Sequence, residues 1–142
     1  MRELSQAEQQ FMQQHRVARL ATADAQGCPF VVPICYAFDG FSVYSALDEK
    51  PKSVAPTRLK RVRNIQANPR VALVIDDYSE DWRALAYIQI RGRADLLVEG
   101  TGEHAEAIRL LRAKYPQYRA MAIDQQPVLR ITPEAIVSWG AV

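Results

Sequence analysis

The fold of this chain is indicated most clearly by the stretch Lys60-Arg61-Val62-Arg63-Asn64-Ile65-Gln66-Ala67-Asn68-Pro69-Arg70-Val71-Ala72-Leu73. It predicts a short basic helix that ends at Asn68-Pro69, because proline cannot continue a helix and pushes the preceding residue out of the helical region. The apolar residues from Val71 onward then predict a strand. A basic helix anchored against a sheet is suited to hold a phosphate. On this stretch alone a solvated basic helix face is the favoured interpretation, and the rest of the chain changes that weighting.

Length and composition are those of an ordinary globular domain. We expect one domain over residues 1–142, a length that buries roughly two-thirds of the unfolded surface. The net charge of +2 is too small to indicate a nucleic-acid or membrane partner. The basic residues are nevertheless unevenly spread and gather between Lys50 and Arg70. This clustering predicts a local anion site.

Cysteine usage and the N-terminus bear on the compartment. Cys28 and Cys35 are the only cysteines, and their spacing matches no zinc or redox pattern, so we expect two free thiols in a reducing environment. The N-terminus is polar and does not resemble a signal peptide, and no apolar run approaches membrane-spanning length. These features predict a cytoplasmic protein without a membrane partner.

Short strands and turns dominate the pattern of the chain. Ser5-Gln6-Ala7-Glu8 is a capping box that predicts a first helix, and an amphipathic helix is expected over 103–115. Asp39-Gly40 predicts a tight hairpin. The whole predicts a mainly-β protein, an antiparallel β-barrel with flanking helices. Strands are expected over 16–22, 29–38, 41–46, 70–76, 84–99 and 128–139, the last interrupted near Pro133.

The segment 29–38 is apolar on both of its faces. A strand of this kind is covered on both sides, here by the barrel interior on one face and by a helix, a cofactor or another subunit on the other. Pro33 lies inside this segment and cannot donate to a strand ladder, so it predicts an edge strand or a bulge.

The segment 84–99 shows a clear alternation. Ile88 and Ile90 point to one face, while Tyr87 and Gln89 point to the other, as expected of a strand with one buried face. Gly92 is expected to bend this strand, as barrel corners require.

Motifs for hydrolysis are missing from the sequence. It contains neither a glycine-rich phosphate loop nor a serine-nucleophile motif. His15 and His104 have no cysteine or carboxylate at ligand spacing, so both are expected to be surface histidines. The chain therefore fits an enzyme whose cofactor carries the difficult step while the protein supplies binding and orientation.

The order of these segments is itself informative. Segment 19–46 is followed by the basic helix with Asn68-Pro69-Arg70-Val71, then by 90–95 and finally by 131–139. This series, over nearly the whole chain, resembles the pyridoxamine 5'-phosphate oxidase-like family, the split β-barrel superfamily of flavin- and deazaflavin-binding oxidoreductases. The resemblance implies an FMN-binding split barrel of antiparallel Greek-key type. It also implies a homodimer with the cofactor site at the subunit interface.

The resemblance assigns the cofactor phosphate to the residues that open the basic helix, here Lys60 and Arg61. Many relatives carry lysine where this chain has Arg61, whose planar guanidinium donates two parallel charge-assisted bonds. Lys50 and Lys52 are expected to reach the phosphate or to lie on a surface loop. The resemblance places the flavin-type ring along the second and third strands and adds two residues of the long strand from the second subunit. These further candidates are Val32, Pro33, Ile34, Tyr44, Ser45 and Ala46, with Tyr87 and Gln89 across the dimer, ordinary barrel packing being the alternative for the apolar ones.

The function implied is an oxidoreductase that transfers hydride between a bound deazaflavin (coenzyme F-420) or FMN and a small organic substrate. The resemblance is closest to the deazaflavin-dependent branch, and no catalytic residue is assigned. An FMN-binding flavoprotein and a non-catalytic flavin or haem carrier or sensor remain alternatives. A nucleic-acid-binding barrel is disfavoured, because no aromatic residue lies between Lys50 and Arg70 to stack bases.

Overall fold

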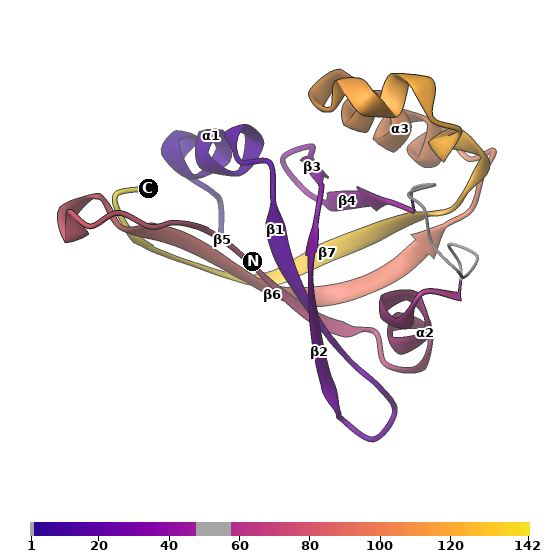
Figure 1. The fold of residues 1–142 in the computed structure, drawn as a ribbon, viewed down its shortest axis with the longest axis horizontal. Helices are drawn as coiled ribbons and strands as arrows, with labels where there is room; N and C mark the ends of the chain where they lie inside the picture. The colour runs from indigo at the N-terminus through magenta and orange to yellow at the C-terminus, as the bar shows by residue number, and fades with distance from the viewer. Residues whose placement is uncertain (1, 48–57) are drawn as a thin grey trace.

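The computed structural model describes residues 2–47 and 58–142. Its strands form one curved antiparallel sheet in the order β2-β1-β5-β6-β7-β4-β3, with helices on either side (Figure 1). This is a half-barrel with flanking helices, as the sequence predicts. The elements are α1 (Gln6–Gln14), β1 (Ala18–Ala23), β2 (Pro29–Ile34), β3 (Ala37–Phe38), β4 (Val43–Ala46), α2 (Lys60–Ala67), β5 (Arg70–Asp77), η2 (Trp82–Ala84), β6 (Ala86–Leu97), α3 (Gly102–Lys114), η3 (Pro116–Ala120), η4 (Ile123–Gln125) and β7 (Val128–Gly140).

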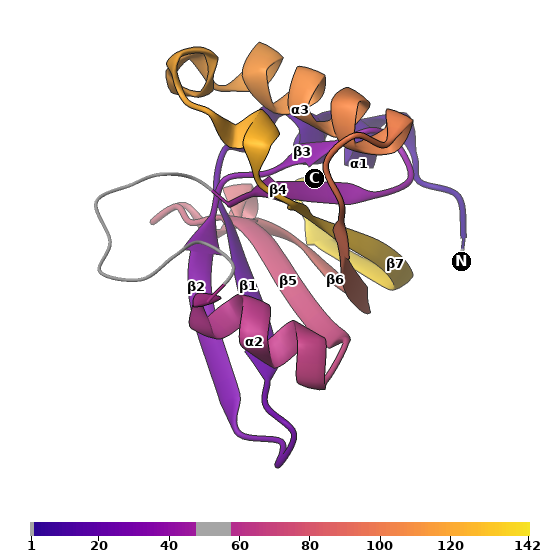
Figure 2. The ribbon, with the colours of Figure 1, turned by 90° about the vertical axis from the view of Figure 1, so that its right-hand side faces the viewer.

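Helices α3 and α2 pack at opposite ends of the strand order. In Figure 2, α3 lies over β3 and β4, and α2 lies against β1 and β2 at the other end of the molecule. The hairpin of β5 and β6 extends away from the body of the protein (Figure 1). Among the described residues, no helix has both the length and the apolar character that a membrane span needs.

The core has two parts because alternate residues of a strand face opposite ways. Leu20, Leu73 and Ile90, from three neighbouring strands, belong to the cluster that fills the barrel. A second cluster lies beneath α3 and includes Tyr44 and Leu111. The long strand alternates as predicted, with Ile88 and Ile90 buried and Tyr87 and Gln89 on the other face.

The apolar segment 29–38 differs from the prediction of one strand. β2 ends at Ile34, and β3 begins only at Ala37. Between them the Tyr36 amide donates to the Tyr115 hydroxyl at 3.0 Å, and that hydroxyl also lies 3.0 Å from the Tyr36 carbonyl. A side chain of another element thus takes the place of ladder partners and breaks the strand. Pro33 lies on the edge strand, as predicted.

The bend at Gly92 is confirmed by a register shift between Arg91 and Gly92. Arg91 pairs with Ala135 and Gly92 pairs with Pro133, so Glu134 is an extra residue in the bulge. A Cβ at position 92 would collide with the Thr132 carbonyl, which is why the close approach needs glycine. β7 continues through Pro133 instead of being interrupted there.

The N-terminal capping box is confirmed. The Glu8 amide donates to the Ser5 hydroxyl at 3.1 Å, and the Ser5 amide donates to the Glu8 carboxylate at 2.9 Å.

The prediction that His104 is a surface histidine is wrong, since this side chain is buried, with Nε2 2.7 Å from the Gln126 carbonyl. This contact could not be predicted from local pattern, because Gln126 lies beyond α3 in an irregular segment.

Candidate cofactor site

The basic helix α2 is held on the barrel by its apolar face and one polar contact. Val62 and Ile65 are buried in the core cluster of the barrel. The Asn64 side-chain amide donates to the Thr22 hydroxyl on β1 at 3.0 Å, and both side chains are buried. These anchors leave the opposite face of α2 to the basic residues. Asn64 was not singled out from the sequence, where an asparagine in a polar helix carries no signal of burial.

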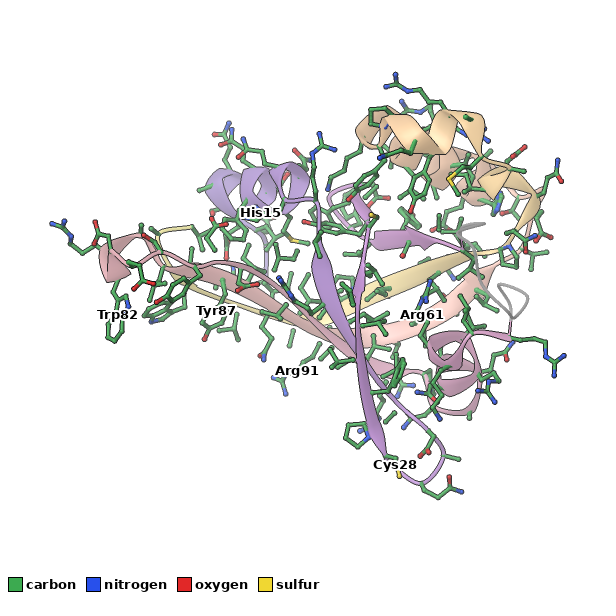
Figure 3. All side chains as sticks on the ribbon, viewed as in Figure 1. His15, Cys28, Arg61, Trp82, Tyr87 and Arg91 are labelled. Carbon is green, nitrogen blue, oxygen red and sulfur yellow. The ribbon has the colours of Figure 1, made fainter. Side chains whose placement is uncertain are left out.

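The N-terminus of α2 gathers positive charge. Leu59 is the N-cap and provides no side-chain hydrogen bond to the first turn, where the helix end carries a partial positive charge. Lys60 is the first helical residue and is exposed, and Arg61 follows it half-buried, beside the upper edge of α2 in Figure 3. The pKa of Asp24 is lowered first by a hydrogen bond from the Cys28 amide, then by one from the Gln26 amide, and then by the Lys60 ammonium. Lys60 therefore lies close to the turn between β1 and β2.

The predicted ring-binding residues of β2 divide between the two faces of the sheet. Val32 pairs with Leu20 and Ile34 pairs with Ala18, so both side chains lie on the barrel side. Pro33 lies between them, exposed, on the opposite face.

The end of β2 meets β4 although these strands are far apart in the strand order. The Ser45 hydroxyl, buried, donates to the Cys35 carbonyl at 2.9 Å. Ser45 and Ile34 are thereby brought together across the closure of the half-barrel. The proton of this hydroxyl is engaged by Cys35, which leaves the Ser45 oxygen as an acceptor.

Tyr44 and Ala46 point to the other side of β4 and belong to the cluster beneath α3. The Tyr44 hydroxyl lies 2.8 Å from the Glu103 carboxylate and 3.1 Å from that of Asp39. Burial, then hydrogen bonding to Glu103, raises the pKa of Tyr44. These two side chains thus support the helix layer, and only their backbone can face a ligand on the barrel side.

Tyr87 and Gln89 lie on a surface that we call the outward face, the side of the sheet opposite the barrel interior. Tyr87 stacks on Trp139 with ring centroids 5.8 Å apart, and Figure 3 shows Tyr87 further from the hairpin tip than Trp82. Two hollows of about 670 and 570 Å³ open on this face. The strand register arranges the residues of the outward face in three rows that cross the strands. The first row is Val31, Ala21, Ala72, Arg91 and Ala135, and the second is Pro33, Arg19, Val74, Gln89 and Val137. The third row is Asp76, Tyr87 and Trp139.

None of these outward residues is buried. Several of them are alanine or apolar, and Val31 is 63% exposed. The sequence prediction identified Pro33, Tyr87 and Gln89 in this group but missed Arg19, Ala72 and Val137. Alternation along β1, β5 and β7 could have found the others, but only the strand order shows that they share one surface.

Two further candidates, Lys50 and Lys52, lie outside the described residues. Within residues 2–47 and 58–142, no three His, Cys, Asp or Glu side chains come together in a way that suits a metal ion.

Comparison with known proteins agrees with this architecture. The model of the family "Pyridoxamine 5'-phosphate oxidase" matches residues 4–140. A curated relative, 5a,11a-dehydrotetracycline/5a,11a-dehydrooxytetracycline reductase of Streptomyces rimosus, is 28% identical over 96% of this chain and 82% of its own.

Solved structures share the fold. HutZ, the haem storage protein of Vibrio cholerae, superposes with a TM-score of 0.76 at 16% identity, over 98% of this chain and 95% of that one. A FAD-binding protein of Mesorhizobium loti superposes with a TM-score of 0.69 at 26% identity, over 96% of this chain and 95% of that one. An F420 reductase superposes with a TM-score of 0.67 at 21% identity, over 94% of this chain and 98% of that one. The curved antiparallel sheet, the anchored basic helix and the family match over residues 4–140 together show that this chain belongs to the pyridoxamine 5'-phosphate oxidase family of split barrels.

Proposed function

We propose that this protein is an oxidoreductase that transfers hydride between a bound deazaflavin (coenzyme F-420) or FMN and a small organic substrate. The observation that carries the proposal is the N-terminus of α2, where Lys60 and Arg61 stand on a helix fixed to the barrel by Asn64 and Thr22. The family match, and the name of the Streptomyces rimosus relative as a reductase, support it.

The residues present suit a phosphate on a ribityl chain, which both cofactors carry. Lys60 and Arg61 offer two cations, and the first turn of α2, which the Leu59 side chain does not cap, adds backbone donors. On the barrel side, Val32 and Ile34 offer apolar cover, and Ser45 offers an acceptor oxygen. The bound cofactor supplies the hydride chemistry, while these residues bind and orient it and exclude water.

We propose further that two copies pair through the outward face. The small side chains of Ala21, Ala72 and Ala135 allow another sheet to approach closely, and the apolar surface of Val31 and Val137 gains from being covered. In this arrangement the partner's copy of the outward face would bring Tyr87 and Gln89 to the cofactor.

The second candidate function is non-catalytic storage or carriage of a flavin or haem, favoured by the likeness to the fold of HutZ. Histidine ligation of a haem iron is hard to arrange with the two histidines of this chain. His15 is held by the Phe11 carbonyl and the Asp77 carboxylate, both at 2.7 Å, and His104 is buried.

The test is a titration of the purified full-length protein with FMN, coenzyme F-420 and haemin, followed by absorbance and cofactor fluorescence. Saturable binding of FMN or F-420, followed by oxidation of the reduced cofactor by a small electrophilic acceptor, would support the oxidoreductase. Tight binding of haemin alone, with a shift of its Soret band, would contradict the oxidoreductase and support a haem carrier. Binding of a flavin without turnover of any acceptor would leave only flavin carriage.

A further inference from the structure

The side chain of Lys114, the last residue of α3, carries its charge inside the protein. Its Nζ atom is buried and has no hydrogen-bond acceptor within the described residues. The ammonium lies 3.9 Å from the centroid of the Tyr36 ring and 5.5 Å from that of Tyr115. Aromatic faces attract a cation, but they do not satisfy its three N–H donors.

The surroundings of this ammonium are positive. The Arg16 guanidinium donates to the Lys114 carbonyl at 2.7 Å and lies 5.7 Å from the centroid of the Tyr115 ring. Burial, and then Arg16, lower the pKa of Lys114 to about 8, against a smaller opposite effect of the Cys35 thiol. Two acids of α3 and η4 form ion pairs with other residues, Glu106 with Arg109 and Asp124 with Arg112.

A groove of about 290 Å³ runs beside Lys114. It lies between α1 and α3 with β3 at its floor, on the side of the molecule away from α2 (Figure 1). At about 30 Å³ for each water-sized group, it has room for on the order of ten of them. Its lining residues are Gln13, Ala37, Phe38, Leu110, Ala113 and Lys114, four of them apolar.

We propose that this groove binds a small monocarboxylate with an apolar tail, whose carboxylate pairs with Lys114. The tail would lie against Phe38 and Leu110, and the carboxylate would supply the acceptor that the ammonium lacks. In the bound state that we propose, Nζ would turn from the Tyr36 ring toward the groove by rotation about the outer torsions of the lysine side chain. Arg16, whose guanidinium donates to the Lys114 carbonyl, adds a second positive charge at this end of α3. This site is independent of the proposed cofactor site.

The probe for the test is hexanoate, with hexan-1-ol as its uncharged counterpart, titrated into the full-length protein and followed by calorimetry and by chemical shifts. Hexanoate is expected to bind saturably and at least tenfold more tightly than hexan-1-ol. Lys114→Met removes the charge but keeps the apolar stem, and it is expected to weaken hexanoate at least tenfold. Arg109→Met removes an exposed cation from the same helix and is expected to change nothing.

The groove and the charge are separated by two further measurements. Leu110→Trp fills the groove while keeping Lys114, and it is expected to abolish hexanoate binding with an unchanged circular dichroism spectrum. Hexanoate affinity is expected to fall as the pH rises above about 8, because only protonated Lys114 pairs with the anion, while Arg16 stays charged. Equal binding of hexanoate and hexan-1-ol, unchanged affinity in a folded Lys114→Met variant, or no saturable binding would overturn the proposal and leave Lys114 as a packing cation.

Discussion

The side chains of Asn64 on α2 and Thr22 on β1 form a buried hydrogen bond of 3.0 Å. It is a polar contact that fixes the basic helix on the barrel. The position of Lys60 and Arg61 therefore depends on a pair of residues that carry no charge themselves.

Replacing Asn64 by alanine is expected to lower the free energy of unfolding by about 1–3 kcal/mol, since the Thr22 hydroxyl loses its buried partner. The loosened helix is also expected to bind the cofactor phosphate less well. Urea denaturation and FMN or F-420 titration measure the two effects. Gln66→Ala changes an exposed residue of the same helix and serves as the control, and equal stability of the two variants would show that the Asn64 contact is dispensable.

Arg61→Ala is expected to weaken binding of FMN or F-420 roughly 10- to 100-fold, the equivalent of losing a charge-assisted bond of about 1.5–3 kcal/mol. Arg61→Lys should recover part of the loss because it keeps the charge. Riboflavin lacks the phosphate, so its affinity should be the same in wild type and Arg61→Ala.

The matched control is Arg63→Ala, which removes an exposed cation from the same helix. If FMN, F-420 and riboflavin all lose affinity to the same extent in Arg61→Ala, the residue does not act on the phosphate.

Ala72 lies at the centre of the first outward row, between Ala21 and Arg91. Ala72→Glu places a charge where we propose that a second sheet approaches, so it is expected to shift the protein from dimer to monomer and to release bound cofactor. Sedimentation and cofactor fluorescence measure this. Val98→Glu, at an exposed site in the turn after β6, should remain dimeric. A monomeric wild type that holds its cofactor would contradict the shared site.

Glu8 gives the stability a pH dependence. Hydrogen bonds from Arg2 first, at 2.7 and 2.8 Å, hold the pKa of Glu8 well below its usual range. Because the folded pKa is depressed, this stabilisation is complete above the unfolded pKa of about 4.3 and is lost as the pH falls toward the folded value. Glu8→Gln is expected to cost about 1–3 kcal/mol at pH 7.

Thermal unfolding of both proteins between pH 7 and pH 2 checks the sign. The difference between wild type and Glu8→Gln should shrink below about pH 4. A stability difference that stays constant over this range would mean that the negative charge of Glu8 does not contribute to it. Glu3→Gln, on an exposed residue of the same segment, should leave stability unchanged.

Local rules account for much of what could be predicted from the sequence. The capping box at Ser5 and Glu8 needs only residues three apart, and Pro69 ends α2 by its own geometry. The alternation of Ile88 and Ile90 against Tyr87 and Gln89 follows from the pleat of a strand. The basic helix, its end and the following strand were also predictable, because each depends on residues close together in the sequence.

The arrangement of the candidate cofactor-site residues could be seen only in the tertiary structure. Pro33 and Ile34 are neighbours in sequence but lie on opposite faces of the sheet, and the side chain of Tyr44 supports α3 instead of facing the barrel. The strand at 29–38 breaks because Tyr115, 79 residues from Tyr36, takes its backbone partners. Such contacts depend on which segments pack together.

The sequence by itself therefore determined the elements, their order and the basic helix that marks the family, since these follow from propensity, periodicity and proline geometry within short windows. Only the tertiary structure decided which face each candidate presents, how Asn64 anchors the basic helix, and that Lys114 finds no acceptor among the described residues. The physical reason is that hydrogen-bond satisfaction and burial are set by residues far apart in the chain, which a local pattern does not contain.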